Sequence, residues 1–169
     1  MKILLAVDEQ GAGETIVDFA AEHTRLQDAD VRIFAAIPSI TDYTSQVVFP
    51  DLVQELRDES RKAAIILVHM IALRLNNNCP SANVVEFVVE GHPANEILSM
   101  AEEWNADLII VGSHGRQGIK RFLLGSVSSA IVSRAPCSVL VVKMTVAEKI
   151  VQKAEEAAGD LVTHKGSGH

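Results

Sequence analysis

The stretch from Asp107 to Lys143, DLIIVGSHGRQGIKRFLLGSVSSAIVSRAPCSVLVVK, constrains the fold of this chain more than any other. It opens on the apolar run 108–111, which is too short to span a membrane but suits a strand buried on both faces. Small residues then recur in the pattern G-x-x-G, nine residues, G-S, at Gly112, Gly115, Gly125 and Ser126. Glycines let the backbone approach a phosphate, and helix N-termini attract anions. The stretch therefore predicts a strand, a phosphate-binding loop and a helix, as in a nucleotide site.

The rest of the chain alternates between two hydrophobic patterns. Apolar runs typical of buried strands occur at 2–7, 31–37, 84–89, 108–111 and 138–143. Helical spacing of apolar residues occurs at 14–27, 50–75 and 94–104, and from the glycine loop to Arg134. Strands alternating with helices form an open parallel sheet with helices on both faces. We therefore expect an α/β fold of five parallel strands in one domain, residues 1–143. Residues 144–164 are expected to form a helical extension, and 165–169 resemble the remnant of a purification tag.

Ligands bind to open parallel sheets beyond the carboxyl ends of the strands. The predicted strand ends carry Asp8, Ile37, Gly91 and Gly112. Because parallel strands all end at the same edge, these residues are expected to converge from separate parts of the chain.

Charge and composition narrow the possible partners. A formal charge of −7 argues against nonspecific binding to nucleic acid, because a polyanion would be repelled. An anionic ligand would have to be held by backbone amides and a few local cations. The first apolar run stops at Asp8 without a cleavage site, and no run is long enough to cross a membrane. We expect a cytoplasmic protein with no membrane partner.

Metal and redox chemistry have little support in the sequence. The two cysteines, Cys79 and Cys137, form no C-x-x-C pair. The histidines show neither H-x-x-x-H nor H-E-x-x-H spacing. We therefore expect no metal held by protein ligands alone.

Over residues 1–143 the chain resembles the universal stress protein family. The resemblance rests on KILLAVD at the start, VVEGHPANEIL before the fourth strand, and DLIIVG through VLVV with its G-x-x-G-(nine residues)-G-S motif. In that family the motif marks the ATP-binding branch. The resemblance implies an adenine nucleotide alpha hydrolase-like sheet of order 3-2-1-4-5 and a homodimer. It also implies a bound adenine nucleotide (ATP, ADP or AMP) and a regulatory role in stress response, exerted through a downstream protein partner.

The resemblance also implies roles for individual residues. Asp8 would contact the adenine base, Ile37 would line the adenine pocket, and Gly112 and Gly115 would lie along the ribose and phosphates. Gly125 and Ser126 would cap the next helix and donate to phosphate. One of the three cations between the glycines, Arg116, Lys120 or Arg121, would neutralise the phosphate tail. The implied nucleotide-binding set is completed by Ala6, Val7, Val127 and Ser128.

One feature departs from the family pattern. Glu9-Gln10 stands where relatives commonly have a small residue pair, and a carboxylate beside a polyanion weakens binding unless a divalent cation lies between them. Mg²⁺ carried with the nucleotide is therefore a further candidate. His114 lies in the glycine loop, but no carboxylate in the motif is placed to orient it as a general base. We expect no catalytic residues, and slow ATP hydrolysis at most.

Two alternatives stay open at this point. In one, the protein is a nucleotide-free dimerisation module in which the glycines only shape a turn. In the other, it is an enzyme that transfers adenylate, although the signatures of such enzymes (SGGxDS, HxGH, KMSKS) are absent. In either case, the apolar strand 138–143 is last in the sheet, and its open edge predicts pairing with a second copy.

Overall fold

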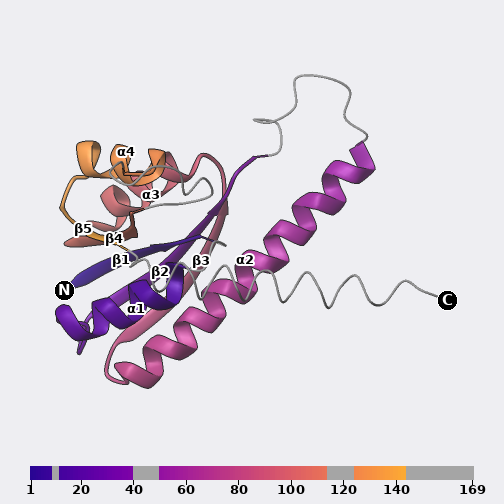
Figure 1. Ribbon diagram of the computed structural model, residues 1–169. Helices are drawn as coiled ribbons and strands as arrows, with labels where there is room; N and C mark the ends of the chain where they lie inside the picture. The colour runs from indigo at the N-terminus through magenta and orange to yellow at the C-terminus, as the bar shows by residue number, and fades with distance from the viewer. Residues whose placement is uncertain (9–11, 40–49, 114–123, 144–169) are drawn as a thin grey trace.

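The computed structural model of the chain describes residues 1–8, 12–39, 50–113 and 124–143 (Figure 1). Predictions that concern Glu9, His114, Gly115, Arg116 or the segment after Lys143 lie outside these residues. The strands are β1 (Lys2–Val7), β2 (Asp30–Ile37), β3 (Asn83–Glu90), β4 (Leu108–Gly112) and β5 (Ser138–Val142). The helices are α1 (Ala12–His23), α2 (Pro50–Asn78), α3 (Pro93–Trp104) and α4 (Ser126–Arg134).

The five strands form one parallel sheet in the order β3-β2-β1-β4-β5. This confirms the predicted α/β fold and the strand order that the family resemblance implies. The chain runs outward from β1 through β2 to β3, then crosses back past β1 to β4 and β5. Strand order therefore reverses between β1 and β4, which is where ligands bind in folds of this kind.

β1 lies at the centre of the sheet because its apolar residues supply both cores. Ile3 and Leu5 pack with α1 and α2 on one face, whereas Leu4 and Ala6 pack with α3 and α4 on the other. Figure 1 shows these helix pairs as layers on opposite sides of the sheet. Side chains alternate between the two faces along a strand, so a strand in this place needs consecutive apolar residues, which β1 has from Ile3 to Val7.

Helix α1 begins and ends earlier than the predicted 14–27. It ends at His23 because the chain then turns: Asp28 has a left-handed φ of 60°, and the Ala29 N–H donates to the Leu26 carbonyl at 3.1 Å. Leu26 is nevertheless buried, so the helical spacing identified a core residue that lies in the turn. At the other end, a Cβ on Gly13 would lie 2.7 Å from Ile71 Cδ1 of α2. Glycine therefore allows α1 to begin against α2.

Helix α2 spans 29 residues, and its N-terminal end extends beyond the sheet (Figure 1). Its C-terminal half is joined to α1 by Arg74. The Nε and one terminal nitrogen of Arg74 donate to the two carboxylate oxygens of Asp18 at 2.8 and 2.6 Å. The other terminal nitrogen donates to Glu14 at 2.9 Å. The hydrogen bonds from Arg74 hold the pKa of Asp18 below its ordinary value.

Replacing Asp18 by Asn should weaken the contact between α1 and α2. Because the Arg74 and Asp18 side chains are 41% and 42% exposed, solvent screens the pair, and we expect a loss of about 1 kcal/mol or less near neutral pH. The folded-state pKa is lowered, so the stabilisation is present above the unfolded pKa of about 3.9 and is lost as the pH falls through the folded value. Urea unfolding at decreasing pH measures this change.

The control for this experiment is Glu102→Gln, which removes an exposed carboxylate from α3. It should leave the unfolding free energy unchanged within error at each pH. A difference between Asp18→Asn and wild type that does not shrink in acid would contradict an ionic role for Asp18.

Candidate functional site

The carboxyl ends of β1, β2 and β4 are neighbours, because β1 pairs with β2 on one side and with β4 on the other. Asp8 directly follows β1, Ile37 ends β2 and Gly112 ends β4. The register pairs Ala6 with Val111, which leaves Gly112 beside the end of β1. Residues that are far apart in the sequence thus meet at the reversal of strand order.

Ser113 closes the base of the glycine motif. Its carbonyl accepts the Gly125 N–H at 2.8 Å and the Ser128 hydroxyl at 3.2 Å. Its own N–H donates to the Val142 carbonyl at the end of β5, also at 2.8 Å. The residues on either side of the segment 114–123 are therefore held together, and both are attached to the sheet.

Helix α4 begins immediately after this junction, with Gly125 as its N-cap. The Ser129 N–H is bonded to the Gly125 carbonyl at 2.8 Å, so the amides of Ser126, Val127 and Ser128 precede the first turn's hydrogen bond. Gly125 has no side chain that could cap them. The start of α4 therefore combines several amide donors with the positive end of the helix dipole, an arrangement that suits an anion.

The donors at this helix start have separate tasks. The Gly125 N–H is already used by Ser113, and the Ser128 hydroxyl also bonds to the Gly125 carbonyl at 3.1 Å. Ser128 is buried and its hydroxyl faces the protein, whereas Ser126 is exposed. An anion at this position would meet backbone amides and the Ser126 hydroxyl, with Ser128 holding the loop in place.

The β1 residues of the implied set play unequal parts. Ala6 and Val7 are buried, on opposite faces of the sheet, so their side chains belong to the two cores. Asp8 is half-buried at the sheet edge. Of these three residues, only Asp8 places a polar side chain at the carboxyl ends of the strands, where the strand order reverses.

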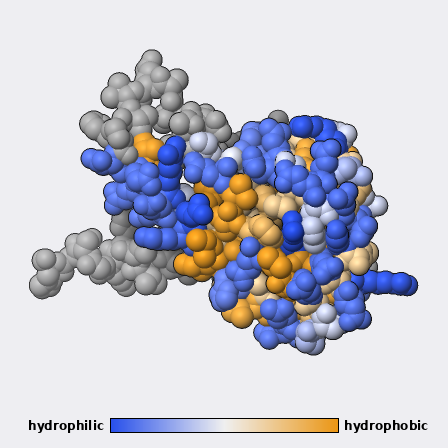
Figure 2. All heavy atoms as spheres, turned by 180° about the vertical axis from the view of Figure 1, so that it is seen from behind, coloured by the Kyte–Doolittle hydropathy of each residue, from blue (hydrophilic) through white to orange (hydrophobic). Residues whose placement is uncertain are grey.

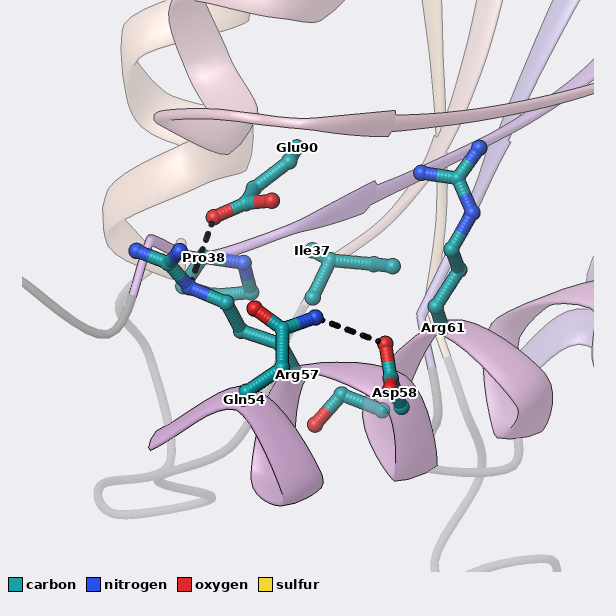
Figure 3. A pocket seen from close by; sticks show the side chains of 8 residues that line it. Ile37, Pro38, Gln54, Arg57, Asp58, Arg61 and Glu90 are labelled. Carbon is teal, nitrogen blue, oxygen red and sulfur yellow. Dashed lines mark hydrogen bonds and ion pairs between the residues drawn. The ribbon is translucent and has the colours of Figure 1, made fainter. Parts of the chain in front are cut away.

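A cavity of about 260 Å³ lies at the carboxyl ends of β2 and β3, against the first half of α2 (Figure 3). Its lining residues are Ile37, Pro38, Gln54, Arg57, Asp58, Ser60, Arg61 and Glu90. Arg57 Nε lies 3.5 Å from a Glu90 carboxylate oxygen, and the Gln54 amide donates to Asp58 at 3.0 Å. Arginine and carboxylate charges are balanced in this lining. An apolar wall with donors and acceptors suits a neutral, hydrogen-bonding group such as a base.

The contribution of α2 to this cavity was missed from the sequence. Pro50-Asp51 correctly marked a helix start, but the helical spacing alone did not show that the polar residues between Gln54 and Arg61 face the end of β2. The only available signal was proximity in sequence to Ile37, across the loop that begins at Pro38.

Among the residues that the structure describes, no group of three or more His, Cys, Asp or Glu side chains is arranged to hold a metal ion. Within the same ranges, none of the helices is long and apolar enough to cross a membrane. The strand-end cluster, the start of α4 and the neighbouring cavity are thus the features on which a functional interpretation rests.

Comparison with known proteins identifies the family. A model of the universal stress protein family matches residues 1–143. The chain belongs to this family. One relative, the universal stress protein MJ0531 of Methanocaldococcus jannaschii, is 34% identical over 126 residues, which is 75% of this chain and 67% of the relative.

Solved structures agree with the fold. The protein MJ0577 superposes with a TM-score of 0.72 at 27% identity, covering 85% of this chain and 96% of that one. A universal stress protein in complex with cAMP superposes with a TM-score of 0.61 at 22% identity, covering 86% of this chain and 98% of that one. A family member from Arabidopsis thaliana with AMP bound superposes with a TM-score of 0.63 at 15% identity, covering 88% of this chain and 94% of that one.

The role of Ser128 in closing the loop can be tested by Ser128→Ala. The substitution removes a buried hydroxyl that donates to two carbonyl oxygens, so we expect a loss of about 1 kcal/mol in unfolding free energy. Exchange of the Gly125 amide with solvent should also become faster, because its bond to Ser113 opens more often. Ser129→Ala, at an exposed position one residue along, should change neither quantity. Equal unfolding free energies and equal exchange rates of the Gly125 amide in the two variants would contradict this role of Ser128.

Proposed function

We propose that this protein binds an adenine nucleotide at the reversal between β1 and β4 and acts, as a homodimer, as a nucleotide-dependent regulator of a stress response. The observation that carries the proposal is the closed glycine motif, in which Gly125 is bonded to Ser113 at 2.8 Å at the start of α4. That closure leaves helix amides at the edge of the sheet where phosphates bind in folds of this class.

The phosphates are assigned to the start of α4. The amides of Ser126, Val127 and Ser128 provide donors there, and Gly112 and Gly115 let the chain approach the ligand closely. A protein of net charge −7 does not attract a polyanion by its overall field, so these local donors must supply the attraction. Arg116, in the same motif, is assigned to the phosphate tail.

The base is assigned to the ends of β1 and β2. Ile37 is buried enough to offer an apolar wall, and it borders the cavity under α2. Its carbonyl already accepts the Gly91 N–H at 2.9 Å, so polar contacts to the base fall mainly to other groups of the lining. Asp8, between this wall and the glycine motif, is placed to contact the base or the ribose.

Relatives support an adenine nucleotide as the ligand. Two family structures that share this fold hold AMP and cAMP. The glycine motif favours a nucleotide with a phosphate chain, and we assign ATP as the ligand, with ADP and AMP as weaker candidates. Mg²⁺ would arrive with the nucleotide, bound to its phosphates.

The test is isothermal titration of ATP into wild type and Gly125→Val. Gly125 has φ −59° and ψ 161°, which valine also adopts, so the substitution adds bulk beside the phosphates without backbone strain. We expect wild type to bind and the variant to lose affinity by about tenfold or more, which corresponds to about 1.4 kcal/mol. The matched control is Ser129→Val, which adds the same side chain at an exposed position of α4.

The outcomes of this titration are distinct. If wild type shows no binding of ATP, the nucleotide proposal is wrong and a nucleotide-free module is favoured. Equal binding by wild type and Gly125→Val would place the site elsewhere. Repeating the titration with ADP and AMP ranks the candidate ligands.

The homodimer is assigned to strand 138–143. β5 is an edge strand, and Val139, Leu140 and Val141 are only partly buried. An apolar edge with unpaired backbone groups is normally covered, and a second copy of the same strand covers it with two-fold symmetry.

Val141→Asp tests this interface by sedimentation velocity at micromolar concentration. Two copies would bring carboxylates together beside a two-fold axis in an apolar contact, so we expect the mass of the assembly to halve. Val85→Asp is the control for an aspartate on an edge strand, because Val85 lies on β3, the other edge of the sheet, and is 44% exposed. A wild type that already sediments as a monomer would contradict the dimer.

A further inference from the structure

The outward face of α2 carries an unusual share of the exposed hydrophobic residues. Large apolar side chains exposed on this helix are Leu52, Leu56, Ile65, Ile66, Met70 and Leu73. Ile66 and Met70 are 63% and 57% exposed, so they are not core residues that merely reach the surface. Figure 2 shows hydrophobic side chains gathered in the middle of one face, beside the polar first turns of α2. Monomeric proteins rarely leave such a contiguous patch uncovered.

These residues form a regular row along the helix. The outer stripe of α2 consists of Leu52, Leu56, Ala63, Ile66, Met70 and Leu73, with Glu59 filling its one gap. The steps along the row alternate between four and three residues, which is the heptad spacing of helices that pack along their length. The stripe covers about 30 Å at 1.5 Å per residue.

The sheet does not explain this stripe. The residues that α2 buries in the domain core are Ala64, Val68, Ile71, Ala72 and Leu75, on the opposite side of the helix. A helix that packs against the protein on a single side needs a single apolar face, whereas α2 has two. The second face therefore indicates a second packing partner, and the heptad spacing indicates that the partner is a helix.

We infer that the outer stripe packs against α2 of a second copy, with the two helices antiparallel. In a parallel pair Glu59 would face the partner's Glu59 inside an apolar seam, which is strongly unfavourable. The antiparallel register instead places Glu59 opposite the partner's Met70.

This register also matches side-chain sizes. Ala63 would lie opposite the partner's Ile66, so a small residue faces a large one. Leu56 would lie opposite the partner's Leu73. Alternation of small and large side chains across a helix pair fills the seam without voids.

A second copy suits this surface better than the segment after Lys143. The described chain ends beside β5, and β4 and β1 separate β5 from the strands that α2 covers. A second copy presents a stripe of the same length and spacing by symmetry, so the two stripes can pair along their whole length.

This interface is independent of the one proposed for β5. α2 lies over β2 and β3, towards the other edge of the sheet, so both surfaces are accessible at once. Two different two-fold contacts on one chain generate a tetramer if the symmetry closes, or a longer assembly if it does not.

Sedimentation of Ile66→Lys tests the contact. Ile66 is largely exposed within one copy, so the lysine should leave the domain folded while it places a charge in the seam. We expect the mass to halve relative to wild type. The matched control is Val132→Lys, an exposed position on α4, which should leave the mass unchanged. An unchanged mass for Ile66→Lys would overturn the inference, and combining it with Val141→Asp separates the two interfaces.

Disulfide formation tests the antiparallel register. Glu59→Cys and Met70→Cys should cross-link when the two variant proteins are mixed and oxidised, because these positions face each other. Glu59→Cys alone should not, because the two copies of position 59 would lie about 16 Å apart along the helices, beyond the reach of a disulfide. Wild type under the same conditions controls for Cys79 and Cys137. Cross-linking of Glu59→Cys alone, or no cross-linking in the mixture, would overturn the register.

Discussion

The backbone of Ser113 holds β4, β5 and α4 together, because its N–H donates to Val142 while its carbonyl accepts from Gly125 and Ser128. The chain leaves β4 at this residue and returns to the sheet at Gly125. Without the junction, the start of α4 would not be fixed against the strand ends, and its amides would point at no defined place. The site therefore depends on a few backbone bonds at the end of a buried strand, whose own position is set by the apolar residues on both of its faces.

Much of this fold follows from the sequence because its strands are buried on both faces. Runs such as Leu108–Val111 have no polar position, so they identify central strands without any knowledge of their neighbours. The order of the strands does not follow in the same way, since right-handed crossovers permit several orders, and here it came from the resemblance to a family. The end of α1 was misplaced because its helical spacing continues to Leu26, while the left-handed Asp28 that turns the chain is not encoded by any glycine or proline.

The site residues also differ in how far the sequence could predict their roles. The residues that end strands, Asp8, Ile37 and Gly112, could be predicted because parallel strands all finish at one edge. What each donor does could not: the Gly125 amide and the Ser128 hydroxyl are used within the protein, which depends on the distance between segments separated by ten or more residues. The polar lining from α2 was also invisible, because apolar spacing locates the buried side of a helix and is silent about what its polar residues face.

Helix α2 has apolar residues on two faces, whereas the helical spacing in the sequence predicted only one. Val68 and Ile71 belong to the core, whereas Ile66 and Met70 belong to the outer stripe. The first turns of the same helix also line the cavity beside Ile37, where Arg57 is the immediate neighbour of Leu56 in the stripe. A ligand that favours one position of these turns would change how well the stripe fits a second copy. Because linkage is reciprocal, assembly through α2 would change the affinity for that ligand by the same factor.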